Sequence, residues 1–163
     1  MRWIWIDRFT EFVSGSHGTA LKNVTLGEDY LSGHFPGYPV LPPTLMIEGM
    51  AQTAGILVGE ARGFADNVIL AKIREARFSD YAVPGDQLLY HARIESIDDS
   101  AAATVGRVDL NGRDIGRVNL MFSYMNHNGG VAGLPEHNFV FTDQFMRLFE
   151  AIRDGGPSGG LRS

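Results

Sequence analysis

Six segments of the chain combine partial alternation of apolar and polar positions with many β-branched and aromatic residues, as strands do. Asn111-Gly112 separates the last two segments and predicts a tight hairpin. Val83-Pro84-Gly85-Asp86 predicts a second turn. The expected strands span residues 3–13, 18–26, 68–78, 87–98, 101–110 and 113–125.

Two further segments have the pattern of helices. Residues 43–58 carry apolar side chains around most of a helical circumference, which predicts a buried helix. Residues 142–153 instead carry one apolar stripe, with Thr142 as the expected N-cap, and should dock on the sheet or on a neighbouring subunit. The stripe consists of Phe145, Leu148, Phe149 and Ile152.

This arrangement of elements predicts an α+β fold. One buried helix among strands joined by short turns favours an antiparallel sheet that wraps around the helix. Residues 1–153 form a single expected domain that includes the C-terminal helix. The glycine- and serine-rich residues 154–163 are expected to be a disordered tail.

Composition narrows the functional classes. The chain has 163 residues, 44% of them hydrophobic, and a net charge of -5, which suits one globular domain and gives no basic footprint for nucleic acid. The absence of cysteine excludes disulfides and thiol chemistry. No apolar run predicts a membrane span, and the N-terminus does not resemble a signal peptide, so a cytoplasmic location is expected. No cluster has metal-ligand spacing, and neither a metal nor a cofactor is expected.

Candidate chemistry is concentrated in residues 34–52, HFPGYPVLPPTLMIEGMAQ. Four prolines stiffen the loop that follows His34, whose neutral imidazole suits a general base. The helix carries one carboxyl group, Glu48, in an apolar setting that favours the protonated, proton-donating form of a carboxyl. Gln52 lies one helical turn beyond Glu48 and can orient it.

The whole string, in register, resembles the active-site pattern of the 3-hydroxyacyl-[acyl-carrier-protein] dehydratases of the hotdog fold. Stretches 20–25, 76–78 and 83–87 also resemble that family, and the similarity covers roughly residues 5–124. The resemblance implies removal of water from a (3R)-hydroxyacyl thioester to give a trans-2-enoyl thioester. It assigns His34 as the base and Glu48 as the acid, contributed by different subunits of a dimer, with Gln52 and Gly37 in supporting positions.

One position departs from the family pattern. The family has glycine where this chain has Pro43, and the N–H of that glycine polarises the thioester carbonyl at the helix start. Proline has no N–H, although its loss at the first helical position costs little for folding. The N–H of Thr44, at the positive end of the helix, is the expected substitute.

The resemblance also implies partners. The substrate is expected on acyl carrier protein or coenzyme A, and the assembly to be a homodimer or larger, such as a trimer of dimers. An acidic carrier protein needs a local basic patch, for which the candidates are Arg62, Lys72, Arg74 and Arg77. A solvated charged face is the alternative interpretation of these four residues.

Two other functions remain open at this stage. A hotdog thioesterase would hydrolyse the thioester with a helix carboxylate and water, but it does not need His34. A non-catalytic subunit that binds acyl thioesters is favoured by Pro43 and disfavoured by the presence of both His34 and Glu48.

Overall fold

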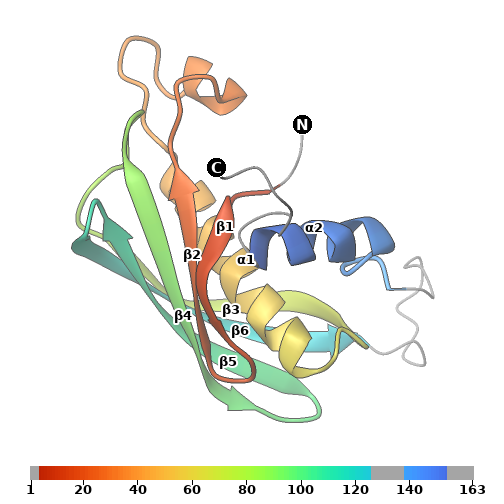
Figure 1. Cartoon of the computed structure of the whole chain (residues 1–163). Coiled ribbons are helices and arrows are strands. Elements are labelled where there is room, and N and C mark those ends of the chain that lie inside the picture. Colours follow the sequence, from red (N-terminus) through yellow and green to blue (C-terminus); the bar gives the residue numbers. More distant parts are fainter. Residues whose placement is uncertain (1–3, 126–137, 154–163) are drawn as a thin grey trace.

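The computed structural model describes residues 4–125 and 138–153 (Figure 1). The expected tail, residues 154–163, lies outside this part of the chain. Within the described residues, no helix is both long and apolar enough to cross a membrane. The elements are β1 (Arg8–Val13), β2 (His17–Asn23), the 3-10 helix η1 (Asp29–Ser32), α1 (Pro43–Ala61), β3 (Asn67–Phe78), β4 (Gln87–Ile97), β5 (Ala101–Leu110), β6 (Arg113–Met125) and α2 (Asp143–Arg153).

The strands form one six-stranded sheet in the order β1-β2-β4-β5-β6-β3. Every neighbouring pair is antiparallel. Figure 1 shows the sheet curving around α1, as the sequence predicts. The two edges of the sheet are β1 and β3.

The predicted turns form where expected. Asn111 and Gly112 have φ values of 51° and 82°, the positive pair that a tight hairpin turn needs between β5 and β6. In the second turn the Asp86 N–H donates to the Val83 carbonyl oxygen at 3.0 Å. The hairpin turn fixes the register of β5 and β6, in which Leu110 pairs with Arg113, whereas the second turn leads from β3 into β4, which is not its neighbour in the sheet.

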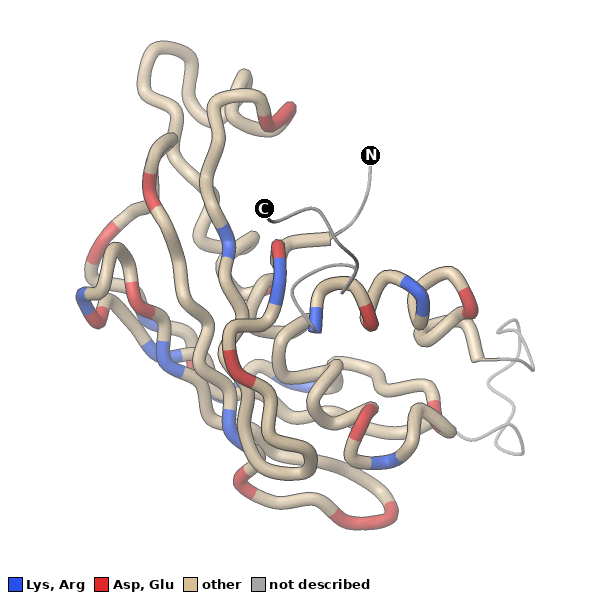
Figure 2. The backbone as a smooth tube through the Cα atoms, in the orientation of Figure 1, with Lys and Arg blue, Asp and Glu red and all other residues tan. Residues whose placement is uncertain are grey.

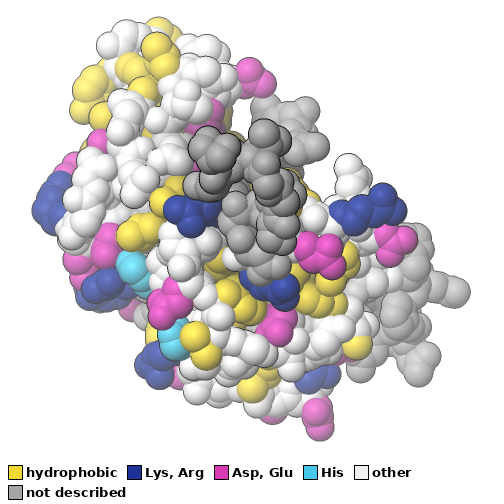
Figure 3. All heavy atoms as spheres, viewed as in Figure 1, with side chains coloured by type: hydrophobic (Ala, Val, Ile, Leu, Met, Phe, Trp, Pro, Cys, Tyr) yellow, Lys and Arg dark blue, Asp and Glu magenta, His cyan; other side chains and the backbone are white. Residues whose placement is uncertain are grey.

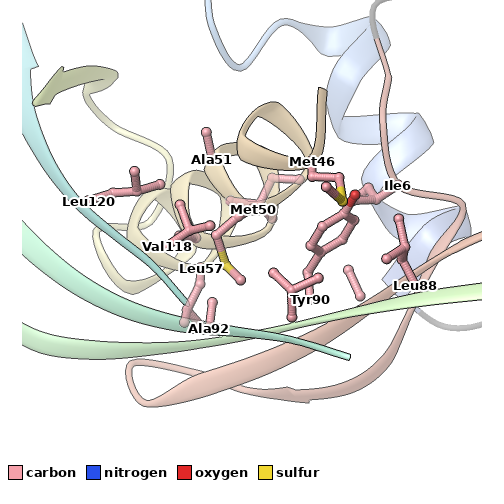
Figure 4. Packing of buried hydrophobic residues seen from close by; sticks show 14 of the residues in the cluster. Ile6, Met46, Met50, Ala51, Leu57, Leu88, Tyr90, Ala92, Val118 and Leu120 are labelled. Carbon is pink, nitrogen blue, oxygen red and sulfur yellow. The ribbon is translucent and has the colours of Figure 1, made fainter. Parts of the chain in front are cut away.

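The core lies between α1 and the concave face of the sheet. Figure 4 shows Met50 and Leu57 pointing from α1 toward the sheet, while Tyr90 points from β4 toward α1. All three side chains are at most 1% exposed. Burial of each large apolar side chain contributes roughly 1.5–3 kcal/mol, so this layer holds α1 in place.

The first strand is shorter than the pattern of residues 3–13 predicts. Strand β1 begins at Arg8, and the preceding backbone N–H of Trp5 donates to the side-chain oxygen of Gln52 on α1, at 2.8 Å. The chain before Arg8 is therefore bonded partly to α1 instead of continuing as a strand along β2.

Helix α2 packs on the sheet through aromatic side chains, as one of the two expected arrangements. The Phe149 ring contacts those of Phe9 and Phe12 in β1, with centroids 6.4 and 5.7 Å away. The Thr142 side-chain oxygen accepts a hydrogen bond from the Phe145 N–H at 3.2 Å, which confirms the predicted N-cap.

Candidate active site

The loop that carries His34 lies at one end of the molecule, between η1 and α1 (Figure 1). The His34 side chain is half-buried, and its Nδ1 lies 3.0 Å from the carbonyl oxygen of Val40. A carbonyl only accepts hydrogen bonds, so a neutral His34 ring carries its proton on Nδ1 and leaves Nε2 as the basic atom. The Val40 N–H returns a bond to the His34 carbonyl oxygen at 2.9 Å, which fixes the backbone as well.

A tight turn follows His34 directly. Phe35 and Tyr38 exchange backbone hydrogen bonds of 3.0 and 2.9 Å across the turn. Pro36 and Gly37 occupy its central positions, and Gly37 has a φ of 78° that glycine adopts without strain. Gly37 thus lets the chain reverse directly after His34.

The start of α1 consists of two prolines followed by Thr44. Pro42 is the N-cap and Pro43 the first helical residue, and the amides of Leu45 and Met46 donate to the Pro42 carbonyl oxygen at 2.8 and 3.3 Å. Since Pro43 has no N–H, Thr44 supplies the first amide of the helix. Thr44 itself is exposed at this end of the helix.

Glu48 and Gln52 form a connected pair on α1. The Gln52 Nε2 donates to Glu48 Oε1 at 2.9 Å, and the Gln52 Oε1 accepts the Trp5 N–H at 2.8 Å. The two bonds together fix which end of the Gln52 amide faces Glu48. The sequence predicts the contact between Glu48 and Gln52 but not the bond from Trp5. That bond comes from a backbone N–H, which every residue except proline carries, so no side-chain pattern indicates it.

The setting of Glu48 differs from the expected one. The sequence predicts a carboxyl enclosed by apolar neighbours, whereas Glu48 is half-buried and lies on a partly exposed stripe of α1 with Thr44 and Gln52. The helix is therefore not apolar all round, because the sheet covers only part of its circumference (Figure 1).

Glu48 and Gln52 line a cavity of about 350 Å³. This volume lies within the range of small-molecule sites. The single chain brings Glu48 and Gln52 together, and His34 is not among the residues that line this cavity. The rest of the lining is apolar, from the N-terminal segment, α1, β3, β6 and the C-terminal region: Ile4, Ile6, Ala51, Gly55, Ile56, Val68, Leu70, Phe122, Val140, Phe141, Phe145, Leu148 and Ile152.

The arrangement suits acid–base chemistry on an apolar ligand. The Glu48 carboxyl and the Gln52 amide can orient a small polar group of a ligand. The apolar side chains around them can contact its hydrocarbon part. Within residues 4–125 and 138–153, no three His, Asp or Glu side chains come together as metal ligands.

Three of the four expected docking residues are paired with carboxylates. Arg62 contacts Asp66 at 2.6 Å, Arg74 contacts Glu95 at 2.6 Å, and Arg77 contacts Glu75. Figure 2 shows positive and negative residues interspersed along the strands, not gathered in one basic patch. The described part of the chain thus fits the solvated charged face better than a dedicated basic patch.

The sequence relates this chain to known proteins. A family model described as the FabA-like domain matches residues 3–117. A 3-hydroxyacyl-[acyl-carrier-protein] dehydratase FabZ from Thiobacillus denitrificans is 38% identical over 120 residues, which cover 71% of this chain and 83% of that protein. The FabZ of Listeria monocytogenes is 35% identical over 119 residues, or 72% of this chain and 83% of its own.

Solved structures share the fold at lower identity. The dehydratase heterocomplex ApeI:P from Xenorhabdus doucetiae matches with a TM-score of 0.65 and 21% identity, over 76% of this chain and 84% of its own. A hypothetical thioesterase with coenzyme A from Streptococcus pneumoniae matches with a TM-score of 0.59 and 8% identity, over 72% and 84% of the two chains. These similarities confirm the hotdog fold, and with the sequence matches they show that the chain belongs to the FabA-like family.

Proposed function

We propose that this chain is a 3-hydroxyacyl-[acyl-carrier-protein] dehydratase, a lyase of fatty-acid biosynthesis. The observation that carries the proposal is the pair of relatives with this name, 38% and 35% identical over more than two thirds of the chain. We take acyl carrier protein as the carrier because the names of these relatives specify it; coenzyme A is the alternative. The cytoplasmic location expected from the sequence stays a prediction.

The proposed reaction uses one base and one acid. The Nε2 atom of His34 takes a proton from the carbon next to the thioester carbonyl, and the electron pair of that C–H bond forms the new double bond. The bond between carbon 3 and its hydroxyl oxygen breaks, and Glu48 gives the departing hydroxyl a proton to release water. Transfer of the proton from His34 back to Glu48, directly or through water, restores the starting enzyme.

The developing negative charge on the thioester oxygen needs a donor. Thr44 supplies the first N–H at the start of α1, where the helix dipole favours negative charge. We assign the oxyanion role to this amide, in place of the N–H that Pro43 lacks. Gln52 supports the acid by holding one oxygen of Glu48.

The base and the acid are proposed to come from two subunits. The cavity beside Glu48 does not include His34 of the same chain, and β3 is an edge strand available for pairing. Figure 3 shows apolar side chains gathered at the end of the molecule that carries the His34 loop. Three large apolar side chains between residues 26 and 38 are exposed: Leu26 by 70%, Phe35 by 55% and Tyr38 by 64%. Such exposed apolar side chains suit burial against a second copy of the chain.

One assay separates this function from its two alternatives. The chain is incubated with 3-hydroxyacyl thioesters, and the product is analysed for the enoyl thioester and for free thiol. A dehydratase gives the enoyl thioester, a thioesterase gives free thiol, and a non-catalytic binding subunit gives neither. Sedimentation of the same sample tests the assembly, because a monomer that turns over substrate would contradict a shared active site.

A further inference from the structure

The C-terminal helix α2 lies outside the matched family region, which ends at residue 117. Three of its side chains nevertheless line the cavity that contains Glu48 and Gln52. These are Phe145, Leu148 and Ile152, spaced so that they share one face of the helix. The region just before α2 adds Val140 and Phe141 to the same lining.

The start of α2 is fixed to the body by hydrogen bonds. Buried Asn67 accepts the N–H groups of Phe139 and Val140 at 2.9 and 3.1 Å. The Asn138 side chain donates to the carbonyl oxygen of Phe64 at 3.1 Å and accepts the Phe141 N–H at 2.7 Å. The segment that leads into α2 is therefore fixed by the side-chain amides of Asn67 and Asn138, without any contribution from a ligand.

The middle of α2 is fixed by an aromatic cluster. Phe149 is 2% exposed, and its ring centroid lies 5.3 Å from that of Phe64 and 5.7 Å from that of Phe12. Phe145 and Leu148 differ from Phe149, because each remains partly exposed on the cavity side. The helix thus divides its apolar residues between anchoring and lining.

The elements that line the cavity differ in chemistry. Among the described residues, Glu48 and Gln52 are the only carboxyl and amide side chains of the lining, and the side chains that α2 contributes are entirely apolar. Under the proposed function, the reacting carbons of the substrate lie at Glu48, so the hydrocarbon tail must extend away from it. A largely apolar cavity that is lined both by Glu48 and by a fixed helix is suited to that tail.

We propose that α2 forms the wall of the acyl-chain cavity and limits the chain length that the enzyme accepts, with Leu148 as a specificity-determining residue. The proposal rests on the proposed dehydratase function and adds to it the occupant of the cavity. A fixed wall rejects chains that are too long, and one methylene in such a pocket changes kcat/KM by about tenfold or more.

The test compares three variants of the full chain on 3-hydroxyacyl thioesters of increasing length. Leu148→Ala enlarges the cavity, Leu148→Trp fills it, and Met146→Ala is a matched control, because Met146 is half-buried on the same helix but does not line the cavity. We expect Leu148→Ala to raise kcat/KM about tenfold or more for the first chain length that the wild type rejects, and Leu148→Trp to lower the limit. The Met146→Ala control should keep wild-type values at every chain length.

A binding measurement separates this proposal from the dehydratase assignment. S-alkyl pantetheine thioethers with saturated tails carry the tail but no reacting group. Their Kd should show the same chain-length limit and the same shift in Leu148→Ala. If the wild type dehydrates nothing, the proposed function fails, while the Kd series still decides the role of α2. An unchanged length limit in both Leu148 variants, a Kd independent of chain length, or a loss of the dimer in Leu148→Ala without a length shift would overturn the proposal.

Discussion

The two helices meet at one cavity but contribute to it in different ways. Helix α1 is enclosed by the curved sheet and presents polar groups to the cavity, Glu48 and Gln52. Helix α2 lies outside that layer and presents only apolar side chains, while Phe149 anchors it to β1. Under the proposed function, the two helices would divide the work: α1 would hold the reacting groups and α2 would shape the substrate cavity, so that one could change without the other.

The largest expected effect tests the chemistry of the region from His34 to Gln52. His34→Ala and Glu48→Gln should each lower kcat by at least about a hundredfold, the scale of a positioned acid or base. Both side chains are half-buried, and neither belongs to the hydrophobic core, so the Tm should change little. Turnover assays with thermal melts check this, and a variant that keeps wild-type turnover would remove its residue from the proposed mechanism.

The next effect tests whether α2 contributes to stability but not to chemistry. Phe149→Ala removes a ring that is 2% exposed and should lower the free energy of unfolding by about 3–5 kcal/mol. Arg147→Ala, on the exposed side of the same helix, is the control and should change it by less than about 0.5 kcal/mol. Urea unfolding measures both.

For the folded fraction of Phe149→Ala, kcat on a short substrate should stay near the wild-type value. A loss of kcat comparable to that of Glu48→Gln would show that α2 also supports the reacting groups. The proposed division of roles between the two helices would then be wrong.

The smallest effect tests the start of α1. If the Thr44 amide already serves the thioester oxygen, Pro43→Gly should change kcat far less than the roughly hundred- to thousand-fold value of one oxyanion-hole donor. Steady-state assays of both proteins measure the ratio. A rise of that full size in the glycine variant would show that the amide at position 43 is the missing donor and that Thr44 does not replace it.

The part of the molecule that sequence reasoning describes well is local. The strand boundaries around Asn111-Gly112, the helix start at Pro43 and the Glu48–Gln52 pair follow from turn chemistry and helical spacing, and the structure confirms them. The hotdog fold followed from the motif resemblance, and the family match supports it.

The rest depends on contacts between distant residues. The Trp5 N–H that bonds to Gln52 is a backbone group, and no side-chain pattern marks it. The stripe of α2 predicts a docked helix, but spacing alone does not distinguish Phe149, which anchors, from Leu148, which lines the cavity. That distinction requires the position of the helix in three dimensions.

The hydrogen bond between Gln52 and Glu48 has a further consequence for where the acidic proton resides. A neutral carboxyl group carries its proton on one of two oxygens, and an oxygen that accepts an amide N–H is the less favourable position for it. Because Gln52 donates to Oε1, the proton of neutral Glu48 is held on Oε2. The Trp5 N–H keeps the amide from reversing, since a reversed amide would set two donors against each other. A backbone group near the N-terminus thereby selects one tautomer of the neutral Glu48 carboxyl, the form that the proposed acid role requires to keep its proton on a defined oxygen.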